Sequence, residues 1–194
     1  MGKHSVVVIA GPTGSGETTI TNAIVKAYPR VTRLVTATTR EPRIGEKHGV
    51  DYYFFSKEEF AREKEKGNIL ESTYIANRDT YYGTYKPDLD VKLHAGSLVV
   101  INPDQVGAQF YKKHYDATTI FLLPESIDAI ERRLRQRNPE FSDAEIAKRR
   151  ANAEAEIENE SPHYDYVVTN SDGKLKSAVS DVVAILKKEG YNLE

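Results

Sequence analysis

The sequence has 194 residues, of which 39% are hydrophobic and 29% are charged. This balance excludes a wholly disordered chain, and the length suits one domain with inserted lobes better than two independent domains. The formal net charge of -2 argues against a dedicated nucleic-acid-binding protein, which is usually strongly basic. The chain has no cysteine, and its early apolar run, Val6–Ala10, is far too short for a membrane span. We expect a cytoplasmic protein with no nucleic-acid or membrane partner, either a monomer or a homodimer.

Short β-branched runs recur along the chain and predict buried strands. The first, Val6–Ala10, is continuous and ends at a glycine, as is typical of a strand buried on both faces of a parallel sheet. Similar runs lie at residues 97–101, 118–123 and 166–169, with a shorter candidate at 34–37. The sequence therefore predicts five buried strands.

Helical patterns lie between these runs. Apolar residues follow i, i+3, i+4, i+7 spacing over residues 20–27, and again over 127–134 after Ser126, which we expect to cap that helix. Residues 178–186 repeat the pattern. Because strands alternate with helices, the sequence predicts an α/β fold with a mostly parallel, five-stranded core sheet.

Two segments interrupt this rhythm. Residues 40–95 are rich in tyrosine and charge and contain alternating stretches at 69–75 and 80–85, which predict an inserted lobe with a small mixed sheet. Residues 136–148 join two helices through a polar loop, with Ser142 or Asp143 capping the second helix. We expect one domain, divided into a core (residues 1–35, 96–135 and 150–194), a lobe (about 36–95) and a helical lid (about 136–149).

A glycine-rich loop follows the first strand and opens the first helix. Residues 11–19 read G-P-T-G-S-G-E-T-T and match the phosphate-loop pattern G-x-x-x-x-G-K-[ST] except at its lysine. Backbone N–H groups of such a loop curl around phosphates, so the pattern predicts ATP binding in a P-loop three-layer fold. Thr18 stands where the hydroxyl ligand of Mg²⁺ belongs. The predicted ATP-binding residues of the loop are Gly11, Pro12, Thr13, Gly14, Ser15, Gly16, Thr18 and Thr19.

Glu17 occupies the position of the phosphate-loop lysine. Two unit charges about 4 Å apart interact by roughly 4 kcal/mol at an effective dielectric constant near 20, so a carboxylate here should weaken ATP use. Three interpretations remain open: a substitution introduced into an active enzyme, a natural inactive relative, or an enzyme whose other cations do the lysine's work.

Three further motifs follow the loop. They are T-T-R-E-P-R-I-G-E at residues 38–46, G-V-D-Y at 49–52 and Y-Y-G-T at 81–84. Together with the phosphate loop they resemble the guanylate kinase family, over nearly the whole chain. The resemblance implies phosphoryl transfer from Mg²⁺-ATP to GMP, giving ADP and GDP.

The motif residues fit a site for the GMP phosphate. Arg40 and Arg43 supply planar guanidinium groups suited to a phosphate dianion, and Tyr52 and Tyr82 offer hydroxyl donors. Glu46 closes the first motif and belongs to the predicted substrate-binding set.

The resemblance also implies residues that recognise the base. Glu71 and Asp104 would accept hydrogen bonds from guanine N1–H and the exocyclic amine, while Thr36 and Thr84 would contact O6 and the ring edge. Asn102, also in the substrate-binding set, stands where the family usually has an aspartate close to the metal and phosphates. That difference removes one negative charge near Glu17.

The resemblance further implies a lid. Arg133, Arg137 and Arg149 would close over the triphosphate and stabilise the transferring phosphoryl group. Together with Glu17, these arginines are the predicted catalytic residues. Asn170, at the end of the last strand, would lie near the adenine of ATP.

Two alternatives to an active GMP kinase remain open. The first is an inactive guanylate-kinase-like module that binds GMP or a phosphorylated peptide. The second is a kinase for another monophosphate, such as dGMP or a modified base, because the sequence does not separate ribose from deoxyribose.

Overall fold

The computed structural model describes residues 5–194, apart from the side chain of Asn77. At its centre is a five-stranded sheet in the order β2-β7-β1-β8-β9, in which every pairing is parallel. The predicted α/β fold is therefore confirmed. The strands of this core sheet are β1 (Val6–Ala10), β2 (Val31–Arg33), β7 (Leu98–Ile101), β8 (Thr118–Pro124) and β9 (Tyr166–Asn170).

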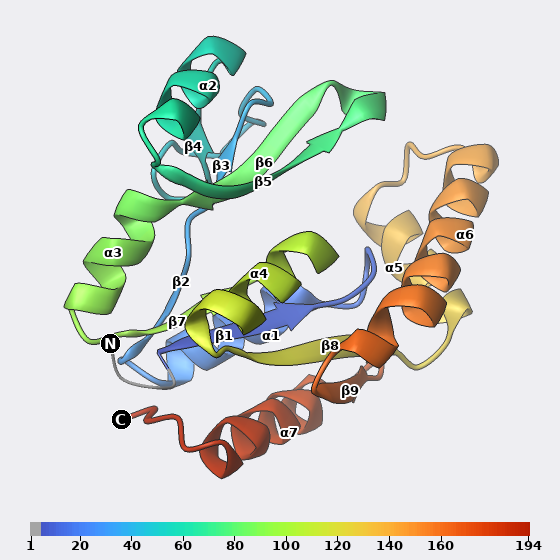
Figure 1. Cartoon of the computed structure of the whole chain (residues 1–194). Helices are drawn as coiled ribbons and strands as arrows, with labels where there is room; N and C mark the ends of the chain where they lie inside the picture. Colours follow the sequence, from blue (N-terminus) through green and yellow to red (C-terminus); the bar gives the residue numbers. More distant parts are fainter. Residues whose placement is uncertain (1–4) are drawn as a thin grey trace.

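Helices cover both faces of the core sheet (Figure 1). On one face, Val7 and Ile9 of β1 pack with residues of α1 (Glu17–Ala27) and α7 (Leu175–Lys188). On the other face, Val6 and Val8 pack with residues of α3 (Lys86–His94) and α4 (Gln105–Tyr115). Successive side chains of a strand point to opposite faces, so the continuous apolar run of β1 contributes to two hydrophobic clusters. This burial fixes the carboxyl end of β1, from which the glycine-rich loop departs.

A second, four-stranded sheet has the order β4-β3-β6-β5 and mixes parallel and antiparallel pairs. Helix α2 (Lys57–Glu65) packs on it through Phe60 and begins with a capping box formed by Ser56 and Glu59. A 3₁₀ turn, Ala76–Arg78, joins β5 to β6 at the hairpin tip. The strands of this sheet are β3 (Ala37–Thr38), β4 (Tyr53–Phe54), β5 (Ile69–Ile75) and β6 (Thr80–Tyr85).

The prediction of a core strand at residues 34–37 is wrong. The fifth core strand is β2, which pairs with β7 from Val31↔Leu98 to Arg33↔Val100. Beyond it, the Val35 N–H donates to the Asp88 carboxylate at 2.9 Å, and Ala37 pairs with the other sheet. Leu34 and Val35 are nevertheless buried, which explains their apolar character. The Leu34 N–H still donates to the Val100 carbonyl of β7 at 2.9 Å, so the backbone leaves the core sheet at Val35.

Helices α5 (Ile127–Arg137) and α6 (Asp143–Glu160) form the pair predicted on either side of the polar loop. Ser126 caps α5 by accepting from the Ala129 N–H, as predicted. Ser142, rather than Asp143, caps α6 by accepting from the Glu145 N–H. A second 3₁₀ turn, Ser161–His163, leads from α6 into β9.

In Figure 1 the four-stranded sheet and the α5–α6 pair rise from the core on opposite sides, and the β5–β6 hairpin extends toward α6. Apolar contacts of Ile130, Leu134 and Ile146 hold α5 and α6 together. Over residues 5–194, no helix combines the length and apolar character needed to cross a membrane.

Candidate active site

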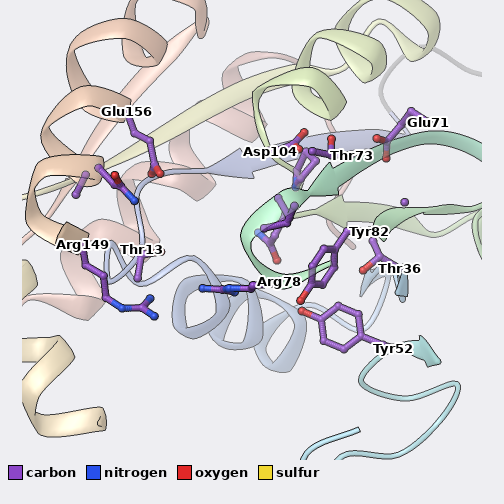
Figure 2. Close-up of a pocket in the computed structure, with 16 residues that line it drawn as sticks. Thr13, Thr36, Tyr52, Glu71, Thr73, Arg78, Tyr82, Asp104, Arg149 and Glu156 are labelled. Atoms are coloured by element: carbon purple, nitrogen blue, oxygen red, sulfur yellow. The ribbon is translucent and has the colours of Figure 1, made fainter. Parts of the chain in front are cut away.

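A cavity of about 470 Å³ lies between the four-stranded sheet, the glycine-rich loop and α6. Figure 2 shows the Tyr52–Tyr82 pair at one side of it, Thr13, Arg149 and Glu156 at the other, and Arg78 between them. The predicted site residues Thr13, Thr36, Tyr52, Glu71, Tyr82, Asn102, Asp104 and Arg149 all line it. The structure therefore brings together residues from both expected substrate sites.

The glycine-rich loop has the shape of an anion cradle. Gly14 and Gly16 have φ values of 90° and 99°, a backbone region that side chains disfavour. The Asn170 side-chain amide donates to the Ser15 carbonyl at 2.7 Å, and a Cβ at position 16 would collide with that amide. Ser15 Oγ is buried and has no hydrogen-bond partner among the described residues, which leaves it free for a ligand. Asn170 thus supports the loop directly.

Glu17 is half-buried at the start of α1 and lines a cavity there, where its carboxyl group is poorly solvated. Burial raises its pKa to about 8, and Glu156 and Glu160 of α6 add to this effect, while a hydrogen bond from the Gly11 backbone opposes it. The carboxyl group is therefore mostly protonated at neutral pH. Position 17 consequently lacks the positive charge of a lysine but does not carry a full negative charge in its place.

The surroundings of Glu17 are acidic as well. Burial and Glu160 together raise the pKa of Glu156 to about 7. Tyr164 is buried beside these carboxyl groups, its hydroxyl has no hydrogen-bond partner among the described residues, and burial raises its pKa. No group of three or more His, Asp or Glu within residues 5–194 could hold a metal ion. Three carboxyl groups, those of Glu17, Glu156 and Glu160, thus influence one another here.

Two of the three predicted lid arginines already have protein partners. Arg133 donates to the carbonyls of Gly14 at 2.9 Å and Asn170 at 2.7 Å, and pairs with Asp172. Arg149 pairs with Glu145 of its own helix at 2.7 Å. Arg137 is exposed and lines a second cavity, of about 260 Å³, together with Glu17, Thr18 and Thr19. Arg133 consequently ties the loop to α5 and β9.

The predicted phosphate-binding arginines lie beside the main cavity. Arg40 makes a bidentate pair with Glu46, with both N–O distances 2.7 Å, and its guanidinium lies 5.0 Å from the Tyr52 ring centroid. Hydrogen bonding to Arg40 lowers the pKa of Glu46 to about 2. Arg43 is exposed, and its backbone N–H donates to Glu46. Glu46 therefore organises both arginine positions.

The base-recognition candidates form a connected group. Thr84 donates to Glu71 at 2.6 Å and also contacts the hydroxyl of buried Tyr111 at 2.5 Å. Burial raises the pKa of Glu71, with a further contribution from nearby Asp104. Asp104 caps α4 by accepting from the Gly107 N–H at 2.9 Å. Two carboxyl groups thus face one cavity from different elements.

Asn102 has a structural role in the core. Its side-chain amide donates to the Ile9 carbonyl at 2.8 Å and to Thr21 Oγ1 at 3.1 Å. These bonds link the end of β7 to β1 and α1. An amide fits this position because its NH₂ group can donate to both the Ile9 carbonyl and the Thr21 hydroxyl, whereas a carboxylate has no donor.

Among the cavity-lining residues that sequence reasoning missed are Arg78 and Glu156. Glu156 lies on a helix outside the motifs. Arg78 had a signal, because it stands between the two alternating stretches that predict a small sheet. An arginine at a hairpin tip can reach well beyond its own sheet.

The guanylate kinase family model matches residues 3–189. The guanylate kinase of Protochlamydia amoebophila is 36% identical over 191 residues, which cover 98% of this chain and 94% of that protein. That of Carboxydothermus hydrogenoformans is 38% identical over 190 residues, covering 97% and 90%. The solved guanylate kinase from Anaplasma phagocytophilum has the same fold, with a TM-score of 0.74 and 24% identity over 99% of this chain and 89% of that one. The chain belongs to the guanylate kinase family of ATP-dependent phosphotransferases.

Proposed function

We propose that the protein transfers the γ-phosphoryl group of ATP to GMP, giving ADP and GDP, at a rate reduced by Glu17. The observation that carries this proposal is a single cavity shared by Thr13 of the glycine-rich loop, Tyr52 and Tyr82 of the four-stranded sheet, and the carboxyl group of Glu71. A phosphate donor and a purine monophosphate can meet there. The relatives named above, with their guanylate kinase activity, support the same reaction.

Guanine would bind at the Glu71 end of the cavity. Its N1–H and exocyclic amine are donors, and the Glu71 and Asp104 carboxylates are acceptors. Adenine presents an acceptor at N1, so it would leave these carboxylates without a hydrogen-bond donor. A buried polar group without a partner loses its hydration and gains nothing in return, which makes adenine binding unfavourable. The Thr84 and Tyr111 hydroxyls hold Glu71 in place for this role. Thr36 lines the same cavity and would contact the ring edge.

The GMP phosphate would bind near the hydroxyls of Tyr52 and Tyr82, with Arg40 and Arg43 behind them. Arg40 is held against Tyr52 by its pair with Glu46, so its orientation is set before the substrate arrives. Preorganised charged donors lose little conformational entropy on binding, which favours affinity. The substrate phosphate would accept hydrogen bonds from Arg40 N–H groups that do not already donate to Glu46.

The glycine-rich loop would hold the phosphates of ATP. Its φ values, the unpartnered Ser15 hydroxyl and the start of α1 fit an anion, whereas Glu17 does not. Thr18 would hold Mg²⁺ together with phosphate oxygens, since the described residues offer no all-protein site. When bound, the ion neutralises phosphate charge. Asn170 and Arg137 border the region where adenosine would lie.

In the reaction, a phosphate oxygen of GMP attacks the γ-phosphorus while the bond from that phosphorus to the β–γ bridging oxygen breaks, and ADP leaves with the electron pair. The protein contributes alignment and charge stabilisation, without a covalent intermediate. Arg149 and Arg137 are the lid residues that we assign to the transferring group. A lysine would add a cation beside them, and Glu17 does not.

The test is ATP-dependent phosphorylation of GMP by the unmodified protein, with dGMP, AMP, CMP and UMP compared at equal concentration. We expect GDP to form slowly and AMP, CMP and UMP to remain unphosphorylated. Comparison of the dGMP and GMP rates shows whether the enzyme distinguishes deoxyribose from ribose. Equal phosphorylation of AMP would contradict the assignment of Glu71 and Asp104 to guanine.

A second candidate function is a module that binds GMP or a phosphorylated peptide without turnover. It is favoured by one observation: Glu17 stands at the position of the phosphate-loop lysine, and burial and nearby Glu156 raise its pKa to about 8. A phosphoserine peptide would then compete with GMP for the Tyr52–Tyr82 end of the cavity. Binding of GMP without any GDP production in the presence of Mg²⁺-ATP would favour this function over the kinase.

A further inference from the structure

The turn between β5 and β6 places an arginine at the middle of the main cavity. Arg78 lines this cavity, and Figure 2 shows its side chain between the Tyr52–Tyr82 pair and the side occupied by Thr13 and Arg149. Among the lining residues, Arg78 and Arg149 are the two that carry positive charge, whereas Arg40 and Arg43 stand outside the lining. Arg78 therefore faces the cavity directly, whereas the motif arginines are not part of its lining.

The backbone of this turn is held by several contacts. Asp79 adopts a left-handed conformation with φ 49°, and its carboxylate accepts from the Tyr74 hydroxyl at 2.7 Å and pairs with Lys57 of α2. Thr80 is buried and its hydroxyl donates to the Arg78 carbonyl at 2.8 Å. The turn thus presents Arg78 from a braced position, which favours a specific role over a freely moving surface charge.

The guanidinium of Arg78 has no hydrogen bond or ion pair with any other residue in the described part of the chain. The neighbouring arginines differ: Arg40 is paired with Glu46, Arg133 with two carbonyls and Asp172, and Arg149 with Glu145. Arg78 is exposed to the cavity and can give all its donors to a ligand. A phosphate group is the ligand that best matches its planar arrangement of donors.

We infer that Arg78 is a phosphate-binding residue of this site, in contact with the GMP phosphate that receives the phosphoryl group. This inference rests on the proposed GMP site. The guanidinium supplies a positive charge to the main cavity, whereas position 17 of the loop supplies none. It therefore reduces the repulsion between the acceptor phosphate and an incoming phosphate chain.

The test is calorimetric titration of GMP and of guanosine into the full chain, unmodified and as Arg78→Gln, Arg78→Lys and Arg62→Gln. Arg62 is an exposed arginine of α2, away from the cavity lining, and controls for loss of one charge from the same lobe. Loss of a charge-assisted contact predicts about tenfold weaker GMP binding for Arg78→Gln. We expect unchanged guanosine binding, partial recovery in Arg78→Lys and unchanged GMP binding in Arg62→Gln.

Each contrary result has its own meaning. Unchanged GMP affinity in Arg78→Gln, or an equal loss for GMP and guanosine, would overturn the role of Arg78 while leaving the GMP site intact. If the unmodified protein bound GMP no better than guanosine, the phosphate site itself would be wrong, and with it both the proposed function and this inference. Thermal melting of each variant shows whether the turn still folds.

Discussion

The two ends of the main cavity differ in how their charges are matched. At the GMP end, Arg40 and Glu46 form a bidentate pair and Thr84 donates to Glu71, while the Arg78 guanidinium is available for a ligand. Beside the loop end, Glu17 lines a second cavity together with Arg137, and burial and the nearby Glu156 raise its pKa to about 8. The contrast teaches that the fold tolerates an acidic residue in the phosphate loop by neutralising it with a proton rather than with a cation.

This contrast separates binding from turnover. The GMP end needs no rearrangement of charge before it binds a substrate, whereas the loop end must receive polyphosphate without a lysine. Phosphate binding would raise the pKa of Glu17 further, because a second negative charge favours the neutral acid. We therefore expect GMP affinity to be ordinary for the family and ATP affinity to be poor.

The largest effect should come from Glu17→Lys. The change places a cation against the phosphates, where one charge pair about 4 Å apart contributes roughly 4 kcal/mol at an effective dielectric constant near 20. After relaxation and screening we expect kcat/KM for ATP to rise by about 100-fold or more. Coupled measurement of ADP production with saturating GMP checks this. Glu17→Gln is the control, and an equal gain in that variant would show that loss of the carboxyl group, not gain of a cation, matters.

Arg40→Gln should weaken GMP binding by about 30-fold, because it removes charge-assisted donors from the phosphate and leaves Glu46 without its partner. Titration of GMP measures the loss. ATP affinity should stay within about twofold, since Arg40 belongs to the other end of the cavity. A comparable loss of ATP affinity would mean that the two ends are not independent.

Glu71→Gln should weaken GMP binding by about tenfold and reduce the preference for guanine over adenine. The amide keeps the shape of the side chain and an acceptor for Thr84, so the fold should be little affected. Competition between GMP and AMP in a binding assay reports the change. Unaltered discrimination would remove Glu71 from base recognition.

The smallest effect concerns pH and stability. The pKa of Glu17 is raised from 4.5 to about 8 in the folded state, so between these pH values the folded protein holds a proton that the unfolded chain has released. Stability should therefore fall as pH rises through this window, by about 1 to 2 kcal/mol for a partly exposed group. Urea unfolding at pH 5.5 and pH 8.5 measures it, and Glu17→Gln should flatten the dependence.

Much of this account could be read from local sequence. The continuous apolar run of β1, the serine cap of α5 and the motif tyrosines each act through short-range patterns, and the structure brings Tyr52, Tyr82 and Glu71 to one cavity. The sequence pattern predicted a core strand at residues 34–37, whereas the structure has β2 at Val31–Arg33, which shows the limit of such patterns. Leu34 is buried by side-chain packing whether or not its backbone joins a ladder.

The parts that sequence could not supply depend on residues far apart in the chain. The pKa of Glu17 depends on α6, which lies more than a hundred residues later, and Arg133 contacts loop carbonyls through a side chain with no local signature. Arg78 reaches the cavity because a hairpin extends toward α6 (Figure 1). Such charge environments arise only when distant elements pack together.

The central claim is that the GMP end is intact while the loop end lacks its cation. Its most direct measurement is a pair of calorimetric titrations, GMP and Mg²⁺ with a nonhydrolysable ATP analogue, into the unmodified protein and Glu17→Lys at pH 7.5. We expect equal GMP affinity in both proteins and a gain of about 100-fold for the ATP analogue in the variant alone. Equal, tight binding of the analogue to both proteins would contradict it.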